Sequence, residues 1–248
     1  MSGVLLQKIG IRRGCFLMHQ AKPVNIASAG LFLRWKVSSA VEPPLDCQVL
    51  EKPCTLILLE DSWLYHTSWE QNFQVKIPSE HGMAYMSLAF SSSNNLEDMM
   101  EEMKQDLSPI HDAVLVTRGP IATWVALFYL ESLSLKGLIM IDPIPFDSLA
   151  HPPESILQDL KQISTLNNLD PMIIQQACSK KLKLEPNSVP MMVIQSTNDD
   201  NFAKLANQMA QRQSDPNGPF GIVETVQIPQ DQPDVIMEKI DTWIESIL

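Results

Sequence analysis

The sequence has little glycine, no nucleotide-binding motif and no long apolar run, and each shortage excludes a class of protein. Only 9 of the 248 residues are glycine, which excludes a collagen-like or glycine-rich low-complexity chain. Neither a GxGxxG nor a Walker sequence is present, so we expect no nucleotide cofactor. No apolar run reaches the ~18–20 residues that a membrane-spanning helix needs.

Cysteine is also scarce, and its spacing predicts no special chemistry. The four residues form neither a CxxC pair nor a cluster with histidine, which argues against a zinc site. A disulfide framework is equally unsupported in a chain of this length. We therefore expect reduced thiols and neither a metal nor another cofactor. The cysteines are Cys15, Cys47, Cys54 and Cys178.

Positive charge is scarce after residue 41. The net charge of −11 argues against a nucleic-acid partner, because phosphate binding needs a basic face. Residues 1–41 contain six lysines or arginines and no acid, whereas all 29 acidic residues lie in 42–248. An acid-free basic segment ahead of an acidic body is typical of an organelle transit peptide. We expect a mitochondrial protein, with a plastid protein or a cytoplasmic protein that keeps a basic arm as alternatives.

Residues 42–248 alternate short apolar runs with amphipathic segments, a pattern typical of an α/β domain. Continuous apolar strands joined by helices predict a mostly parallel, doubly wound sheet with helices on both faces. We expect residues 144–188 to form a reduced cap or helical insertion. The predicted strands span 54–59, 73–77, 112–116, 135–141, 190–195 and 222–228. The predicted helices span 95–107, 120–131, 153–164, 171–182, 202–212 and 233–248.

Several short motifs occur in the order in which an α/β hydrolase carries them. In chain order, the five motifs correspond to five parts of an α/β hydrolase. These parts are a strand and loop followed by a tryptophan, the next strand with its glycine-rich loop, the nucleophile elbow, the strand after the elbow helix, and the turn that carries the catalytic acid. The motifs are Leu58–Ser62 with Trp69, Ile77–Gly82 with Ser87, Val114–Ala122, Leu138–Pro143, and Asn198–Asp200. From about residue 53 onward the chain resembles the α/β-hydrolase fold superfamily.

The resemblance implies a nucleophile in the elbow and a histidine base after the last strand. Gly119 occupies the elbow and has no side chain with which to attack a carbonyl. Thr117 comes two residues earlier, so we expect it to point elsewhere. None of the five histidines lies beyond His151, and the region expected to hold the base contains Asp231.

The resemblance also implies backbone donors for an oxyanion and an acid that orients the base. Glu60 and Asp61 stand at the oxyanion-loop position, where two carboxylates would destabilise a developing negative charge. The acid alone is retained, as Asp199 or Asp200, and these residues also suit a turn and a helix cap. The pattern therefore indicates a degenerate member that lacks the nucleophile and the catalytic histidine.

We interpret the chain as a catalytically inactive α/β-hydrolase-like protein that acts as a structural or binding subunit in an organelle, with protein partners or a larger complex. A second hypothesis is a serine-type ester or thioester hydrolase with a displaced nucleophile, Ser62, Ser87 or Cys54, and His66 or His81 as its base. A third is a protein that binds a small apolar ligand in the retained cleft.

Overall fold

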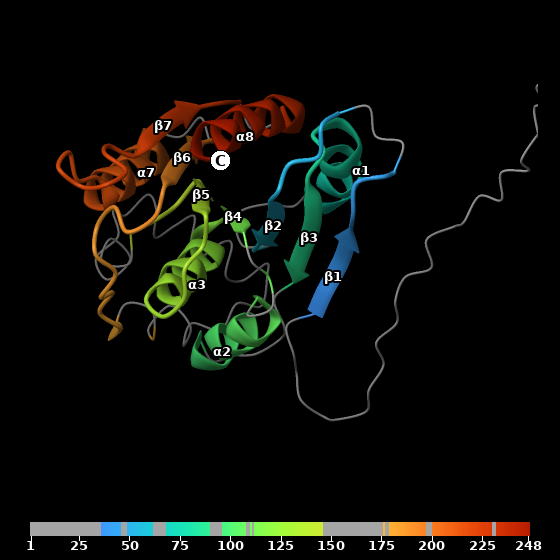
Figure 1. Ribbon diagram of the computed structural model, residues 1–248. Helices are drawn as coiled ribbons and strands as arrows, with labels where there is room; N and C mark the ends of the chain where they lie inside the picture. The colour runs from blue at the N-terminus through green and yellow to red at the C-terminus, as the bar shows by residue number, and fades with distance from the viewer. Residues whose placement is uncertain are drawn as a thin grey trace, which may run out of the picture. The chain divides into compact units, whose positions relative to one another are not determined.

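The computed structural model describes residues 36–45, 49–61, 68–89, 96–107, 110, 112–145, 176, 179–196, 200–229 and 232–248. All of them belong to one compact unit, Phe32–Leu248. Seven strands form one sheet in the order β1-β3-β2-β4-β5-β6-β7 (Figure 1). Strand β1 is antiparallel to β3, and the other neighbours are parallel. The predicted α/β class with a mostly parallel sheet is confirmed.

The element bounds are as follows. The strands are β1 (Lys36–Val41), β2 (Thr55–Glu60), β3 (Ala84–Ala89), β4 (Ala113–Arg118), β5 (Gly137–Ile141), β6 (Met191–Gln195) and β7 (Glu224–Gln227). The described helices are α1 (Glu70–Glu80), α2 (Leu96–Leu107), α3 (Pro120–Leu130), α7 (Asp200–Gln213) and α8 (Pro233–Ile247).

Two hydrophobic cores lie on opposite faces of the sheet. Successive side chains of a strand point to opposite faces, so Ile57 and Leu59 join one core and Leu56 and Leu58 join the other. The first core also contains the apolar faces of α2, α3 and α7. The second contains those of α1 and α8. Helices therefore cover both faces, as the continuous apolar strands predicted.

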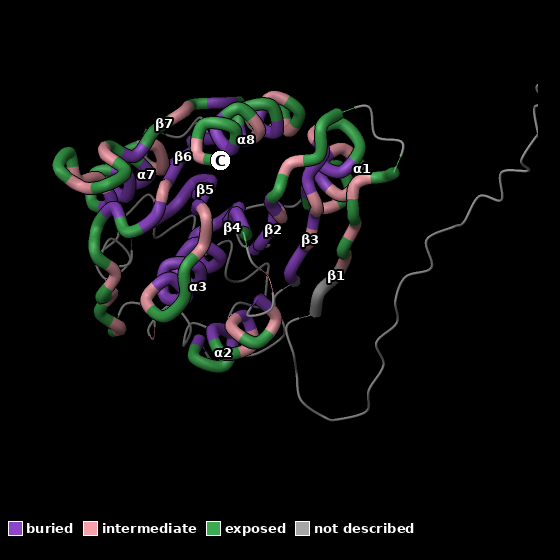
Figure 2. The backbone as a smooth tube through the Cα atoms, viewed as in Figure 1, coloured by how far each residue is buried: buried purple, intermediate pink, exposed green. Residues whose placement is uncertain are grey.

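Helix α3 is the most deeply buried helix among the described residues. All its residues from Pro120 to Leu130 are buried, and the helix is purple where Figure 2 shows it behind a nearer loop. Proline is its first residue, a position where the missing N–H costs no hydrogen bond within the helix. A helix that is buried on all sides is fixed by its neighbours. The N-terminus of α3 is therefore held firmly at the carboxyl end of strand β4.

The strand predicted over residues 73–77 is wrong, because these residues lie inside helix α1. Phe73 and Ile77 are fully buried, whereas Val75 between them is 66% exposed. In a strand the three side chains would share one face. Residues four apart share a face in a helix, and this spacing identifies the segment as helical.

Two strands were not predicted. Strand β3 begins at Ala84, in the segment where the motif of Gly82 and Ser87 predicted a glycine-rich loop. Residues 36–41 were assigned to the basic N-terminal segment, but in the structure they form the edge strand β1. Strand β1 is irregular, with a register shift between Val37 and Ser39. Its six residues, KVSSAV, mix polar and apolar side chains without an apolar run, so only its pairing with β3 reveals it.

Several predictions lie outside the described residues. These include residues 1–35, the helix 153–164 and most of the helix 171–182. No helix in the described part of the chain has the length and apolar character needed to cross a membrane.

The contact between Gly137 and helix α8 yields a test of the packing. A Cβ on Gly137 would lie 2.7 Å from Cη2 of Trp243 and 3.0 Å from Cδ1 of Ile247. We expect Gly137→Ala to lower the free energy of unfolding by about 1–3 kcal/mol, because overpacking forces neighbours to move. Urea denaturation measures this. In a Trp243→Phe background the benzo ring atoms are gone, so the same change should cost less, and an equal cost in both backgrounds would contradict this packing.

Candidate functional site

The candidate site lies where β2 and β4 end side by side. Glu60 and Arg118, the last residues of the two strands, are paired in register, and the N–H of Asp61 donates to the carbonyl of Arg118 at 3.0 Å. The chain then turns at Gly119 directly into α3. The predicted strand-turn-helix around Gly119 is therefore present.

Gly119 adopts a conformation that a side chain would strain. Its φ is +100° and its ψ is 164°. A Cβ built on this residue would lie 2.2 to 2.4 Å from the three carboxylate atoms of Asp61. Two reasons therefore favour glycine at this position. The positive φ is strained for a residue with a side chain, and the carboxylate of Asp61 leaves no room for a Cβ. The space that a side chain on residue 119 would need is filled by the carboxylate of Asp61.

The Asp61 carboxylate is bound by the N-terminus of α3. Its Oδ2 accepts hydrogen bonds from the N–H of Ile121 at 2.8 Å and of Ala122 at 3.0 Å, and the residue is only 4% exposed. The first N–H groups of a helix have no partner within the helix, and the helix dipole favours a negative charge there. Asp61 therefore acts as an internal anion at a place that suits anions.

Residue 120 is a proline, which has no backbone N–H to donate. Sequence reasoning missed this consequence. In the α/β-hydrolase arrangement one oxyanion donor is the backbone N–H of the residue after the nucleophile. Here that residue is proline, which has no N–H. The signal was available in the sequence as Gly119-Pro120, but it was interpreted only as a helix start. The next two N–H groups, from Ile121 and Ala122, are those taken by Asp61.

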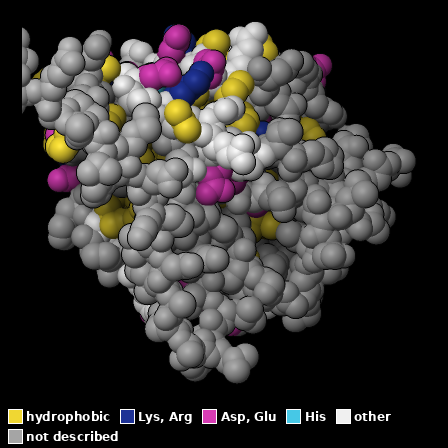
Figure 3. Space-filling view, turned by 90° about the vertical axis from the view of Figure 1, so that its right-hand side faces the viewer, with side chains coloured by type: hydrophobic (Ala, Val, Ile, Leu, Met, Phe, Trp, Pro, Cys, Tyr) yellow, Lys and Arg dark blue, Asp and Glu magenta, His cyan; other side chains and the backbone are white. Residues whose placement is uncertain are grey.

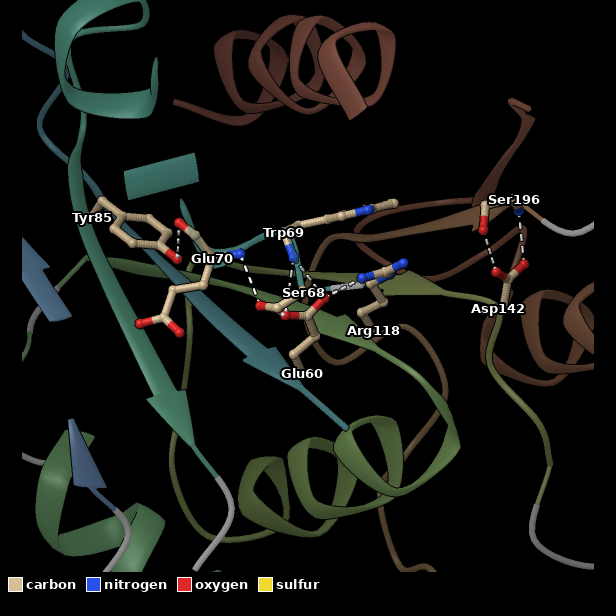
Figure 4. Close-up of polar contacts among 8 residues, drawn as sticks. All are labelled: Glu60, Ser68, Trp69, Glu70, Tyr85, Arg118, Asp142 and Ser196. Carbon is tan, nitrogen blue, oxygen red and sulfur yellow. Dashed lines mark hydrogen bonds and ion pairs between the residues drawn. The ribbon is translucent and has the colours of Figure 1, made fainter. Parts of the chain in front are cut away.

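Glu60 makes the second set of contacts at this edge. Its carboxylate forms an ion pair with Arg118 and accepts hydrogen bonds from the N–H of Trp69 at 3.1 and 3.2 Å and from the hydroxyl of Ser68 at 2.5 Å (Figure 4). The contacts to Ser68 and Trp69 lie just before α1, so Glu60 satisfies donors at the start of that helix.

Arg118 is the buried cation of the site. It is 1% exposed, and its guanidinium lies 3.8 Å from the ring centre of Trp69, a cation–π contact. The Trp69 ring in turn stacks on Phe73, with 5.8 Å between ring centroids. The positive charge of Arg118 balances the carboxylate of Glu60, with which it forms an ion pair.

A third carboxylate is held at the end of β5. The Oδ1 of Asp142 accepts a hydrogen bond from the N–H of Ser196 at 2.7 Å, and its Oδ2 accepts one from the Ser196 hydroxyl (Figure 4). Both residues are buried, and Asp142 has a φ of +48°. Sequence reasoning treated Asp142 only as the end of a strand and missed this contact.

The hydroxyl of Thr117 is bound between α3 and β5. Its Oγ1 lies 3.1 Å from Oγ1 of Thr123 and donates to the carbonyl of Ile139 at 3.3 Å. Both threonines are fully buried. The hydroxyl closest to the elbow in sequence is therefore engaged inside the core.

The other predicted site residues are not brought to Gly119, or lie outside the described residues. Ser87 donates to Oε1 of Glu70 at 2.7 Å and lies 2.9 Å from the hydroxyl of Ser39. Cys54 precedes β2, about 20 Å from the carboxyl end of that strand at about 3.3 Å per residue. Four predicted residues fall outside the described part of the chain, namely Ser62, His66, Asp199 and Asp231.

His81 belongs to a polar cluster at the amino end of the sheet. Its Nδ1 lies 3.1 Å from Oδ2 of Asp241, whose other oxygen pairs with Lys52. Lys52 also pairs with Glu245 at 2.8 Å. Burial alone would lower the pKa of Lys52, but its hydrogen bonds to the two carboxylates raise the pKa overall. Among the described residues, no three His, Cys, Asp or Glu side chains are placed to hold a metal ion.

The Asp61 contact predicts a measurable share of the stability. Asp61→Asn should lower the free energy of unfolding by about 1–3 kcal/mol, because two buried hydrogen bonds lose their charged acceptor. Asp98→Asn is the matched control, since Asp98 is an exposed acid in the first turn of α2. Its effect should stay below about 1 kcal/mol. Urea denaturation measures the free energy of unfolding of both variants. An equal loss in the two variants would contradict the contact between Asp61 and α3.

Comparison with solved structures identifies the fold. The chain superposes on alpha/beta hydrolase domain-containing protein 10 from mouse with a TM-score of 0.57 at 12% identity, covering 81% of this chain and 93% of that one. A hydrolase from Oleispira antarctica gives a TM-score of 0.57 at 11% identity, covering 86% and 95%. An alpha-beta serine hydrolase homologue from Coxiella burnetii gives 0.51 at 12% identity, covering 84% and 90%.

The sequence by itself finds no such match. No protein-family model and no curated protein sequence matches the chain. The likeness is therefore one of three-dimensional structure, over 81% and 86% of this chain for the first two neighbours. On these grounds the chain has the α/β-hydrolase fold.

Proposed function

We propose that this protein is a catalytically inactive α/β-hydrolase-like protein that works by binding other proteins. The observation that carries the proposal is the Asp61 carboxylate, which fills the space over Gly119 and takes the N–H groups of Ile121 and Ala122. A tetrahedral oxyanion formed at this place would meet a carboxylate instead of donors. Its energy would rise, whereas catalysis depends on lowering it.

Four separate losses support the proposal. Gly119 supplies no nucleophile, Pro120 supplies no N–H, Asp61 occupies the site, and no histidine follows His151 in the sequence. The members of a catalytic triad act as a unit, so the loss of several leaves little of the rate enhancement. Glu60 and Asp61 instead serve the two helices that begin at this edge.

Activity-based labelling tests the proposal directly. We expect the purified protein neither to react with a fluorophosphonate probe nor to cleave p-nitrophenyl acetate above background, because no activated side-chain oxygen stands at the elbow. Labelling is read by intact mass and cleavage by absorbance. Robust ester cleavage that a single substitution abolishes would overturn the proposal.

Restoring a serine should not restore activity. We expect Gly119→Ser alone to destabilise the fold, since its Cβ overlaps Asp61. The double variant Asp61→Gly/Gly119→Ser removes the overlap, yet it should remain without turnover because Pro120 still lacks an N–H and the base is still missing. Stability is measured by thermal unfolding and turnover with the same ester. Efficient turnover by the double variant would show that the base and donor are present after all.

The displaced-nucleophile hypothesis can be tested at Cys54. This residue is 5% exposed, and burial raises the pKa of its thiol, the opposite of what a reactive cysteine needs. We expect Cys54 to resist iodoacetamide at neutral pH in the folded protein and to react once the protein is unfolded in urea. Peptide mass spectrometry locates the label. Rapid alkylation of Cys54 in the folded protein would support a thiol nucleophile.

We further propose that the protein functions in an organelle, most simply the mitochondrion. The support is the charge step between residues 1–41 and 42–248, since an inward-negative potential favours entry of positive charge by about 2.3 kcal/mol per charge per 100 mV. We expect a fusion of residues 1–41 to a fluorescent protein to enter mitochondria. Mass spectrometry of the endogenous protein should find that its N-terminus has been shortened. An intact Met1 on protein recovered from the cytosol would refute the proposed mitochondrial location.

A further inference from the structure

The last six residues of the basic N-terminal segment are a strand of the folded domain. Strand β1 runs antiparallel to β3, from Lys36 opposite Ala89 to Val41 opposite Tyr85. It is the outermost strand on the side of the molecule that Figure 3 faces. Residues 1–41 therefore divide into two parts, the residues ahead of β1 and β1 itself.

A chain of hydrogen bonds fastens β1 to β3 and to α1. The hydroxyl of Ser39 lies 2.9 Å from that of Ser87 in β3, and the Ser87 hydroxyl donates to Oε1 of Glu70 at 2.7 Å. Because Ser87 has only one hydroxyl proton, Ser39 is the donor to Ser87. Ser87 is 3% exposed, and a buried polar group that loses a partner costs free energy. The side chain of Ser39 therefore holds β1 in place together with the backbone ladder.

Removal of β1 would open the edge of β3. Strand β3 pairs with β2 on one side and with β1 on the other, so β1 covers the outer N–H and C=O groups of β3. An uncovered strand edge is a template for pairing with other chains and promotes aggregation. A domain that lacks Lys36–Val41 would therefore lose stability and solubility together.

We infer that proteolytic maturation of this protein removes residues only ahead of Lys36 and keeps β1 in the sheet. The inference rests on the organelle location proposed above and narrows the part of the segment that can be removed. Five of the six lysines and arginines of residues 1–41 precede Lys36, so such a cut still removes most of the positive charge. The basic segment thus carries an address ahead of Lys36 and a strand of the mature domain from Lys36 onward.

The N-terminus of the mature protein in its own cells tests the inference. We expect peptide mass spectrometry to find a chain that has lost Met1 and its neighbours but begins at or before Lys36. A first residue at Val37 or later would overturn the inference and leave the organelle location standing. An intact Met1 would overturn the inference as well, and on cytosolic protein it would refute the location too.

Cleavage on either side of β1 tests the physical reason. Two variants of the full-length chain carry an inserted recognition sequence for a sequence-specific viral protease, after Gly30 in one and after Glu42 in the other. Cleavage after Gly30 should leave the unfolding temperature within about 2 °C of the uncleaved variant. Cleavage after Glu42 should lower it by at least about 5 °C and increase light scattering. The uncleaved variants control for the insertions, and equal shifts at the two positions would overturn the inference.

Ser39 and Ala40 offer a matched pair of substitutions in the full-length chain. Ser39→Asp puts a carboxylate where a hydroxyl donates to Ser87, next to Glu70. Ala40→Asp adds the same charge at the neighbouring exposed residue, whose side chain points to the opposite face of the sheet. Only the first substitution should loosen β1.

Trypsin measures this loosening directly. Cleavage after Lys36 requires β1 to open, and no other lysine or arginine lies between Lys36 and Lys52. We expect Ser39→Asp to speed the appearance of chains that begin at Val37 at least tenfold, and Ala40→Asp less than threefold. Equal rates for the wild type and both variants would overturn the inference. None of these measurements depends on catalysis, so their failure would leave the inactive role proposed above untouched.

Discussion

The arrangement at the carboxyl ends of the strands depends on one contact. In this contact the first N–H groups of α3, those of Ile121 and Ala122, donate hydrogen bonds to the carboxylate of Asp61. A buried helix N-terminus carries unsatisfied donors and a partial positive charge, and something must compensate both. Water or a substrate would do so in an open active site. Here the chain supplies its own anion from the end of the neighbouring strand, and the side chain at position 119 must be absent to make room.

Two adjacent acids thereby serve two different helices. Glu60 binds the donors at the start of α1 and the guanidinium of Arg118, while Asp61 binds the start of α3. Asp142, at the end of the next strand β5, is also a buried carboxylate that accepts a backbone hydrogen bond, in this case from the N–H of Ser196. The carboxyl ends of β2 and β5 thus carry a row of internal contacts that stabilise the fold.

The errors of sequence reasoning have physical causes. The residues around Val75 have strand-forming composition, but the burial of Phe73 and Ile77 on one face follows a helical period that packing decides. Strand β1 is short, mixes polar with apolar residues and lies at the edge, so its place comes only from pairing with β3. Composition cannot reveal a strand whose main support is a hydrogen-bonded neighbour far away in the sequence.

The sequence alone determined the parallel sheet, the turn at Gly119, and the absence of a histidine after residue 151. These follow from local facts: continuous apolar runs, a glycine before a proline, and a count of residues. Only the tertiary structure decided what the acids at 60 and 61 do. The side chain of Glu60 meets Arg118, 58 positions away, and that of Asp61 meets Ile121 at the start of α3, 60 positions away. Such contacts exist only once β2 and β4 lie side by side.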